Sequence, residues 1–274
     1  MLHHQNSKKS QSKKSWINTL GSIVIISMLS ACSDFGADHS VCDLQLLSLK
    51  IAKQSEDAIT GNAQAIAELR KSQEKLKLIS PRVIQKVSKQ VDAEHLQRDI
   101  QEINENINLM IKSQKDMNSL YDFSLAVADT IPMIQAEYNL LTDQMIRSNA
   151  SATQVVVAKN QVFIAERILR SLASITKDDP YAVSTMEDVF ADIETFDAYL
   201  KAQLEGNASL GVERINDKEQ REGLESIQND TNKVLLSGSK QLQNSSNQII
   251  KFSNAIKQNR EKTMEILNIL QKIE

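Results

Sequence analysis

Glycine and proline are scarce in this sequence, with 7 and 3 residues among 274. An average protein carries about 12% of the two together. Sandwiches, barrels and Rossmann sheets need many tight turns, which these residues supply. The composition therefore argues against those sheet folds and predicts an all-α protein.

Aromatic residues, histidine and cysteine are also few. Aromatics make up 4% of the chain and the net charge is −3, which argues against a stacking or phosphate-binding surface for nucleic acid. Only His39 and His95 follow the first 31 residues, and Cys32 and Cys42 are the only cysteines. Zinc sites, Cys–His catalysis and disulfide frameworks lack the residues they need. We therefore expect no cofactor, no nucleic-acid partner and no enzymatic activity.

The N-terminal segment has the pattern of an export signal. Four lysines within residues 8–14 precede an apolar stretch at 16–31. As a helix this stretch would rise about 24 Å, short of the roughly 30 Å hydrocarbon core of a membrane. A basic lead, a short apolar segment and small residues at its end are typical of a signal peptide, predicted here for residues 1–31.

The end of this segment, Leu29-Ser30-Ala31-Cys32, is similar to the lipobox of bacterial lipoproteins. The resemblance implies cleavage before Cys32 and acylation of that cysteine, with residues 32–40 as the lipidated cysteine and its tether. Several acyl chains anchor a protein stably. The chain would then lie in the periplasm, and Ser33 after the cysteine favours the outer over the inner membrane. The alternative is an uncleaved membrane anchor.

Cys42 is left over in this interpretation, because lipid on Cys32 removes its partner within the chain. A small buried helix residue is the favoured interpretation, with a disulfide between two copies as the alternative.

From Val41 onward the apolar spacing is helical, with few interruptions. A turn is predicted at Gly61-Asn62 and a helix end at Ser80-Pro81. A new helix is predicted to start at Thr130–Pro132, another at Asp178–Pro180, and a helix end at Gly206–Gly211.

The last segment has a heptad pattern, in which seven of ten positions are apolar. We expect this seam to pack inside a helical bundle, as such seams more often do than form an independent coiled coil. Its positions are Leu242, Ser245, Ile249, Phe252, Ile256, Asn259, Thr263, Ile266, Leu270 and Ile273.

An internal echo suggests two copies of one helical module. Residues 47–51 and 58–62 are followed by a helix, and residues 164–168 and 174–178 repeat this order. Tandem modules are therefore predicted at 41–130 and 131–274, the second with a long C-terminal helix.

A set of short matches in fixed order resembles the periplasmic sensor region of the PilJ family, the chemoreceptor-like proteins of type IV pilus systems. The similarity covers about residues 41 to 258. The matching segments are Leu46–Lys53, Gly61–Ala65, Ile131–Tyr138, Gln154–Ala158, Gln161 with Ile164–Ile168, Phe190–Asp192 with Phe196, Leu204–Ala208 and Leu210–Val212.

This resemblance implies an elongated, antiparallel, all-helical sensor of two modules outside the inner membrane. In the family this region feeds a cytoplasmic signalling domain, whereas here we expect a lipoprotein signal and no second membrane span. The chain is then expected to supply recognition alone, binding pilin or a pilus-linked chemoreceptor through helix faces. One alternative is a structural envelope lipoprotein that forms a homo-oligomer through the 242–273 seam. Another is a small-molecule or oxyanion sensor acting through a separate receptor.

Two basic residues are candidates for ligand binding. In related nitrate-sensing kinases a Gln-Arg pair binds the anion, and Leu49-Lys50 stands at the corresponding step here. Lysine is a point charge without the planar fork of arginine. The second module keeps the arginine in Glu166-Arg167, where a helix-surface or interhelical pair is the favoured interpretation. The site candidates are therefore Lys50 and Arg167.

Acidic and aromatic residues gather in the second module. A di-metal carboxylate bundle would need Glu-x-x-His pairs, and no histidine follows His95. We therefore expect a solvated acidic face. Phe190, Phe196 and Tyr199 are expected in the core, with an aromatic-lined ligand cleft as the alternative. The acidic set is Glu166, Glu187, Asp188, Asp192 and Glu194.

Overall fold

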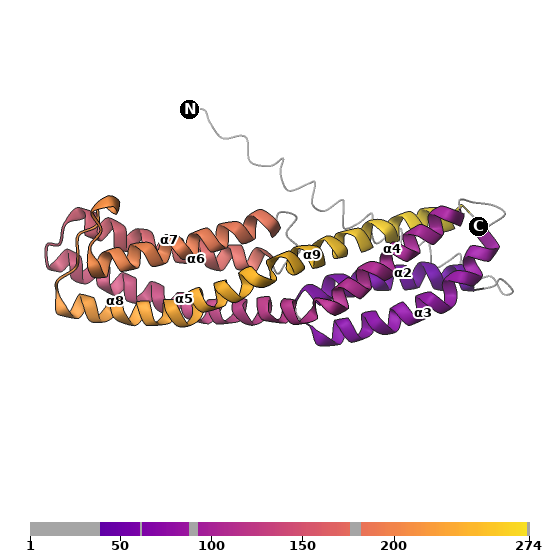
Figure 1. The fold of residues 1–274 in the computed structure, drawn as a ribbon, viewed down its shortest axis with the longest axis horizontal. Helices are drawn as coiled ribbons and strands as arrows, with labels where there is room; N and C mark the ends of the chain where they lie inside the picture. Colours follow the sequence, from indigo (N-terminus) through magenta and orange to yellow (C-terminus); the bar gives the residue numbers. More distant parts are fainter. Residues whose placement is uncertain (1–38, 61, 88–92, 176–181, 273–274) are drawn as a thin grey trace, which may run out of the picture.

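The computed structural model describes residues 39–60, 62–87, 93–175 and 182–272, and the fold is all-α over these ranges, as the composition predicted (Figure 1). The one strand-like feature in the described part is an isolated bridge between Asn207 and Val212. In chain order the helices are α2 (Ser40–Asp57), η1 (Ala58–Thr60), α3 (Ala63–Val87), α4 (Ala93–Lys112), α5 (Gln114–Arg147), α6 (Ala152–Ile175), α7 (Ala182–Glu205), η2 (Ala208–Leu210), α8 (Lys218–Asp230), the π-helix η3 (Thr231–Leu236) and α9 (Ser237–Leu270).

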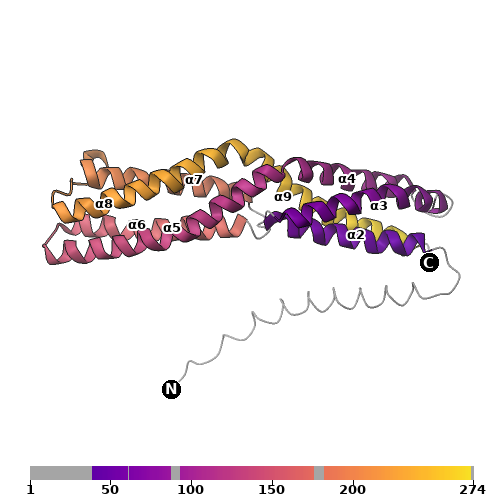
Figure 2. The ribbon, with the colours of Figure 1, turned by 90° about the horizontal axis from the view of Figure 1, so that it is seen from below.

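Two long helical spans run the length of the molecule. One is α4 followed by α5 after a break at Ser113, and the other is α8 continued through η3 into α9. The α2–α3 hairpin packs on α4 and α9 at one end, and the α6–α7 hairpin packs on α5 and α8 at the other. The result is an elongated rod of two four-helix bundles joined end to end, visible in both Figures 1 and 2.

The predicted module boundary between residues 130 and 131 lies within the continuous helix α5, and the two bundles share helices across it. Thr130 is buried inside α5, and α9 packs mainly against α2 and α4 in the first bundle. The repeated unit is a hairpin followed by a long helix, and each long helix contributes to both bundles. The exchange places each hairpin against two further helices, so that apolar faces on both sides of the hairpin are covered.

The heptad seam of α9 lies inside the bundle, as predicted. Leu242, Ile249 and Ile256 are all fully buried. Two of its three polar positions have partners on α2, since Asn259 Nδ2 donates to Ser55 Oγ at 3.0 Å and Thr263 Oγ1 donates to the Ser48 carbonyl at 3.1 Å. The polar interruptions therefore fix the register between α9 and α2.

The two proline positions are corrections to the sequence interpretation. Pro81 does not end a helix and Pro132 does not begin one, because α3 and α5 continue through them. Both prolines are exposed, and so are Lys77 and Ala128, whose carbonyls would otherwise be bonded by the missing N–H groups. Water can hydrogen-bond to those two carbonyls, while packing of the buried faces keeps both segments helical.

The predicted turns agree better with the structure than the predicted proline boundaries do. Asn62 begins α3, its Oδ1 accepting from the amides of Gln64 and Ala65, whereas Gly61 and the loop at 178–180 lie outside the described residues. The predicted end of α7 is confirmed. Gly206 and Gly211 there have φ of 85° and 66°, a left-handed conformation that glycine adopts without strain.

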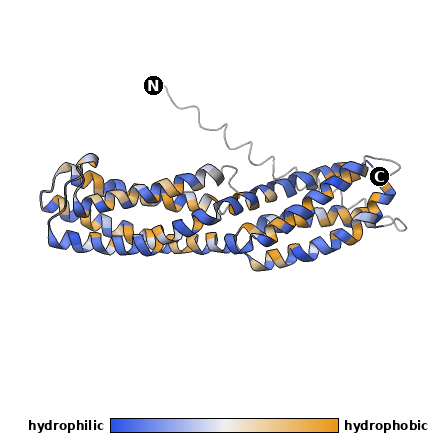
Figure 3. Cartoon of the chain, in the orientation of Figure 1, coloured by the Kyte–Doolittle hydropathy of each residue, from blue (hydrophilic) through white to orange (hydrophobic). Residues whose placement is uncertain are grey.

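Each helix in Figure 3 carries both hydrophilic and hydrophobic residues along its length, as expected for helices with one buried stripe. Within the described ranges, none of the helices combines the length and apolar character needed to cross a membrane.

Candidate functional site

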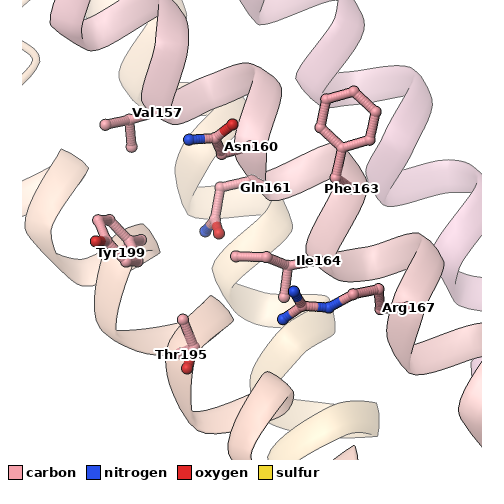
Figure 4. A pocket seen from close by; sticks show the side chains of 8 residues that line it. All are labelled: Val157, Asn160, Gln161, Phe163, Ile164, Arg167, Thr195 and Tyr199. Carbon is pink, nitrogen blue, oxygen red and sulfur yellow. The ribbon is translucent and has the colours of Figure 1, made fainter.

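A cavity of about 330 Å³ opens between α6 and α7 in the second bundle (Figure 4). Its size lies at the lower end of the range for small-molecule sites. Helix α6 supplies most of the wall, since residues at i, i+4 and i+7 share a face. The lining residues are Val157, Asn160, Gln161, Phe163, Ile164 and Arg167 from α6, with Thr195 and Tyr199 from α7.

The inner wall of the cavity includes the side-chain amide of Gln161, which belongs to a buried hydrogen-bond network. Gln161 Nε2 donates to the Phe196 carbonyl at 2.8 Å and to Tyr138 Oη at 3.3 Å, and Tyr138 Oη donates to Gln203 Oε1 at 3.0 Å. The Tyr138 ring also meets the Phe196 ring edge-on, with centroids 5.9 Å apart. Burial raises the pKa of Tyr138, which keeps the phenol protonated as a donor.

The network fixes which way the Gln161 amide points. Rotating it by 180° would set its oxygen against the Phe196 carbonyl, two acceptors face to face. Gln161 Oε1 is therefore the atom left over, and it has no hydrogen-bond partner among the described residues.

Arg167 forms an interhelical ion pair, which confirms the favoured interpretation of this residue. Its Nε donates to Asp192 Oδ2 at 3.0 Å, and its Nη2 pairs with the other oxygen of the same carboxylate. This bidentate contact raises the pKa of Arg167 further above its usual range. The arginine is thus held in place at the cavity by α7.

The five acidic residues of the second module fall into two groups, those that pair with a basic residue and those that are exposed to solvent. Asp192 is not part of a solvated face, because its carboxylate is mostly buried under Arg167. Glu166 pairs with Arg170 at 3.6 Å and accepts from Gln135. The remaining acids, Glu187, Asp188 and Glu194, are exposed, as predicted. Within the described residues no group of histidine, cysteine and acidic side chains is arranged to hold a metal ion.

The structure does not bring the two predicted basic residues together. Lys50 is exposed on α2 in the first bundle, whereas Arg167 lies in the second. The lipidation site Cys32 lies outside the described residues. Gln161 appeared in the sequence analysis only as part of a matching motif. No sequence signal marked it as a buried amide, because its partners come from α5 and α7.

Cys42 also differs from expectation. It is half-buried on α2 and is disulfide-bonded, so the prediction of a buried free thiol is wrong. The sequence contains one other cysteine, Cys32. A thioether to lipid and a disulfide cannot both involve Cys32 in the same molecule.

We expect the Tyr138→Phe substitution to lower the free energy of unfolding by about 1–3 kcal/mol, because Gln203 Oε1 would lose its buried donor. Tyr121→Phe is the matched control, since Tyr121 is 38% exposed and its change should stay within about 0.5 kcal/mol. Urea unfolding followed by circular dichroism measures both. Equal effects of the two substitutions would contradict a structural role for the network.

By its fold and its cavity, this chain is an elongated all-α protein built of two helical bundles. Its sequence is similar to two known proteins. It is 30% identical over 176 residues to AlkN of Alcanivorax borkumensis, which is named for methyl-accepting chemotaxis, and this match covers 64% of the chain. It is 27% identical over 197 residues to PilJ of Pseudomonas aeruginosa, covering 68% of the chain. The resemblance to PilJ predicted from the motifs is therefore confirmed, and the chain contains a chemoreceptor-like helical region.

The matches cover only a part of each relative's own length. The matches span 26% of AlkN and 29% of PilJ, so the chain corresponds to under a third of either protein. No protein-family model matches the chain.

Proposed function

We propose that this chain is a lipid-anchored periplasmic binding protein, not an enzyme, which recognises a protein partner in type IV pilus signalling. The partner would be pilin or a pilus-linked chemoreceptor, and the signal would be passed on by that partner. The observation that carries the proposal is the similarity to AlkN and PilJ over about two thirds of the chain.

The shape of the rod supports a recognition role at a distance from the anchor. The start of α2 and the end of α9 lie at the same end of the rod in Figures 1 and 2, and an anchor on Cys32 would precede the start of α2 in the chain. The α5–α6 and α7–α8 connections lie at the opposite end. Helices α4 and α5 together rise about 80 Å, so the second bundle projects away from the membrane towards a partner.

We propose lipidation of Cys32, with the outer membrane favoured because Ser33 follows it. Lipid on Cys32 leaves Cys42 without a disulfide partner in the same molecule, so the lipidated chain requires that the Cys42 disulfide is absent or joins two copies. Mass spectrometry of the mature chain tests the lipidation directly. Acyl chains on an N-terminal Cys32 support the anchor, whereas a Cys32–Cys42 disulfide in an unacylated chain contradicts it.

The functional test is crosslinking in living cells, followed by capture of the tagged chain and mass spectrometry. We expect pilin or a chemoreceptor to be recovered with the wild-type chain and lost with Cys32→Ala, because an unanchored chain is diluted in the periplasm. Cys42→Ala is the matched control, since it removes a cysteine and leaves the lipidation site intact. Recovery of only the chain itself or of general envelope proteins would contradict the proposal.

The structure gives no support to the alternative of self-association through the C-terminal seam. The seam residues from Leu242 to Leu270 are covered by helices of the same chain. Pairing two copies through them would require the first bundle to open.

A further inference from the structure

The cavity between α6 and α7 is lined by a buried amide whose oxygen accepts no hydrogen bond from the described residues. Gln161 is 1% exposed, and its Oε1 has no hydrogen-bond partner in the described part of the chain. The large majority of buried side-chain polar atoms in proteins are hydrogen-bonded. In Figure 4 the Gln161 side chain points between Tyr199, Ile164 and Thr195, which line the cavity. An N–H group of a bound molecule would satisfy this oxygen.

Because the unpaired atom of Gln161 is a hydrogen-bond acceptor, an oxyanion does not fit at this residue. Nitrate and similar anions offer only acceptors, and both Nε2 hydrogens of Gln161 are already used by Phe196 and Tyr138. The polar atom that remains requires a donor. An anion alone would leave it unpaired.

A second polar group lies at the same cavity. Arg167 uses Nε and Nη2 for Asp192, and among the described residues its Nη1 has no partner. The side chain is 55% exposed, so this nitrogen is accessible to a ligand. The pair with Asp192 fixes the guanidinium plane in advance, which lowers the entropic cost of binding a carboxylate.

The remaining walls are apolar or aromatic. Val157 is buried, Ile164 and Tyr199 are half-buried, and Phe163 is 68% exposed at the rim. An exposed phenylalanine beside a cavity of about 330 Å³ suits a small ligand with an apolar side chain.

We propose that this cavity binds an α-amino acid with an apolar side chain. The ammonium donates to Gln161 Oε1, the carboxylate accepts from Arg167 Nη1, and the side chain packs against Val157, Ile164 and Tyr199. This site goes beyond the recognition of a protein partner and stands on separate observations.

Isothermal titration of the full mature chain with L-leucine and L-phenylalanine tests the proposal. Two analogues of leucine separate the two polar contacts, since 4-methyl-2-oxopentanoate lacks the N–H donor and leucinamide lacks the carboxylate. We expect binding of at least one amino acid, binding of both analogues weaker by about tenfold or more, and no heat with sodium nitrate. Absence of binding by both amino acids, which leaves the cavity to water, would overturn the proposal. So would binding of nitrate in their place.

A pair of arginine variants localises the site. Arg167→Gln should weaken amino-acid binding about tenfold or more, because a charge-assisted contact is lost. Arg170→Gln should bind as wild type, since Arg170 lies one turn further along α6 and does not line the cavity. Circular dichroism checks that both variants are folded. Equal affinities of the two variants would place binding elsewhere and overturn the proposal. The titration uses no partner protein, so its failure is independent of the capture experiment.

Discussion

Replacing Lys262 by methionine should strongly destabilise the first bundle, because this lysine neutralises a buried acid. Lys262 on α9 contacts three acids, Asp99 at 3.0 Å, Glu265 at 2.9 Å and Glu102 at 3.3 Å. The Asp99 side chain is 1% exposed, and its Oδ2 has no hydrogen-bond partner in the described structure. Burial raises the pKa of Asp99, and the hydrogen bond from Lys262 offsets this only in part.

We expect Lys262→Met to lower the free energy of unfolding by about 3 kcal/mol, because a buried carboxylate is left without its counter-ion. Lys257→Met on the same helix is the matched control, since the Lys257 side chain is exposed to solvent. Its effect should stay within about 0.5 kcal/mol. Urea unfolding at pH 7 measures both. Similar losses in the two variants would contradict a special role for Lys262.

The pH dependence of the Lys262→Met variant gives a second, independent readout. A carboxyl whose pKa is higher in the folded than in the unfolded chain binds protons preferentially in the folded state. Acidification from neutral pH towards the ordinary aspartate pKa of 3.8 should therefore reduce the deficit of the variant relative to wild type. Asp99→Asn combined with Lys262→Met should recover part of the loss at pH 7. A deficit that does not change with pH would exclude Asp99 as its source.

Gly238→Ala should destabilise the junction between the two bundles, although alanine is the better helix former. Gly238 lies in the first turn of α9, directly after the π-helix η3. A Cβ built there would lie 2.1 Å from Cδ2 and 2.3 Å from Cε2 of Phe123, whose ring is buried on α5. Overpacking of this kind costs about 1–3 kcal/mol, which exceeds the gain of up to about 1 kcal/mol in helix propensity. We expect a net loss of about 1–2 kcal/mol.

Gly223→Ala is the matched control and should have the opposite sign. Gly223 lies within α8, and nothing lies within 4 Å of a Cβ built on it. Alanine should therefore stabilise the chain by about 0.5–1 kcal/mol. In a Phe123→Ala background the cost of Gly238→Ala should disappear, because the clashing ring is gone. Thermal and urea unfolding measure these variants. A cost that persists without the ring would contradict the packing explanation.

Composition and periodicity determined a large part of this protein. The scarcity of glycine and proline predicted the all-α fold, and the heptad spacing identified the buried face of α9. The motif order predicted the similarity to PilJ. These features are local, because a helix and its buried stripe are encoded by residues within a few turns of one another.

The tertiary structure alone decided which helices meet. An apolar stripe shows which face of a helix is buried but not which helix covers it. Helix α9 follows the second hairpin in the sequence, yet it packs mainly against α2 and α4 of the first bundle. The same reason explains why α3 and α5 continue through Pro81 and Pro132, where packing outweighs the local preference to end a helix. It also explains the cavity, because the Gln161 amide is oriented by Tyr138 and Phe196, residues 23 and 35 positions away in the chain.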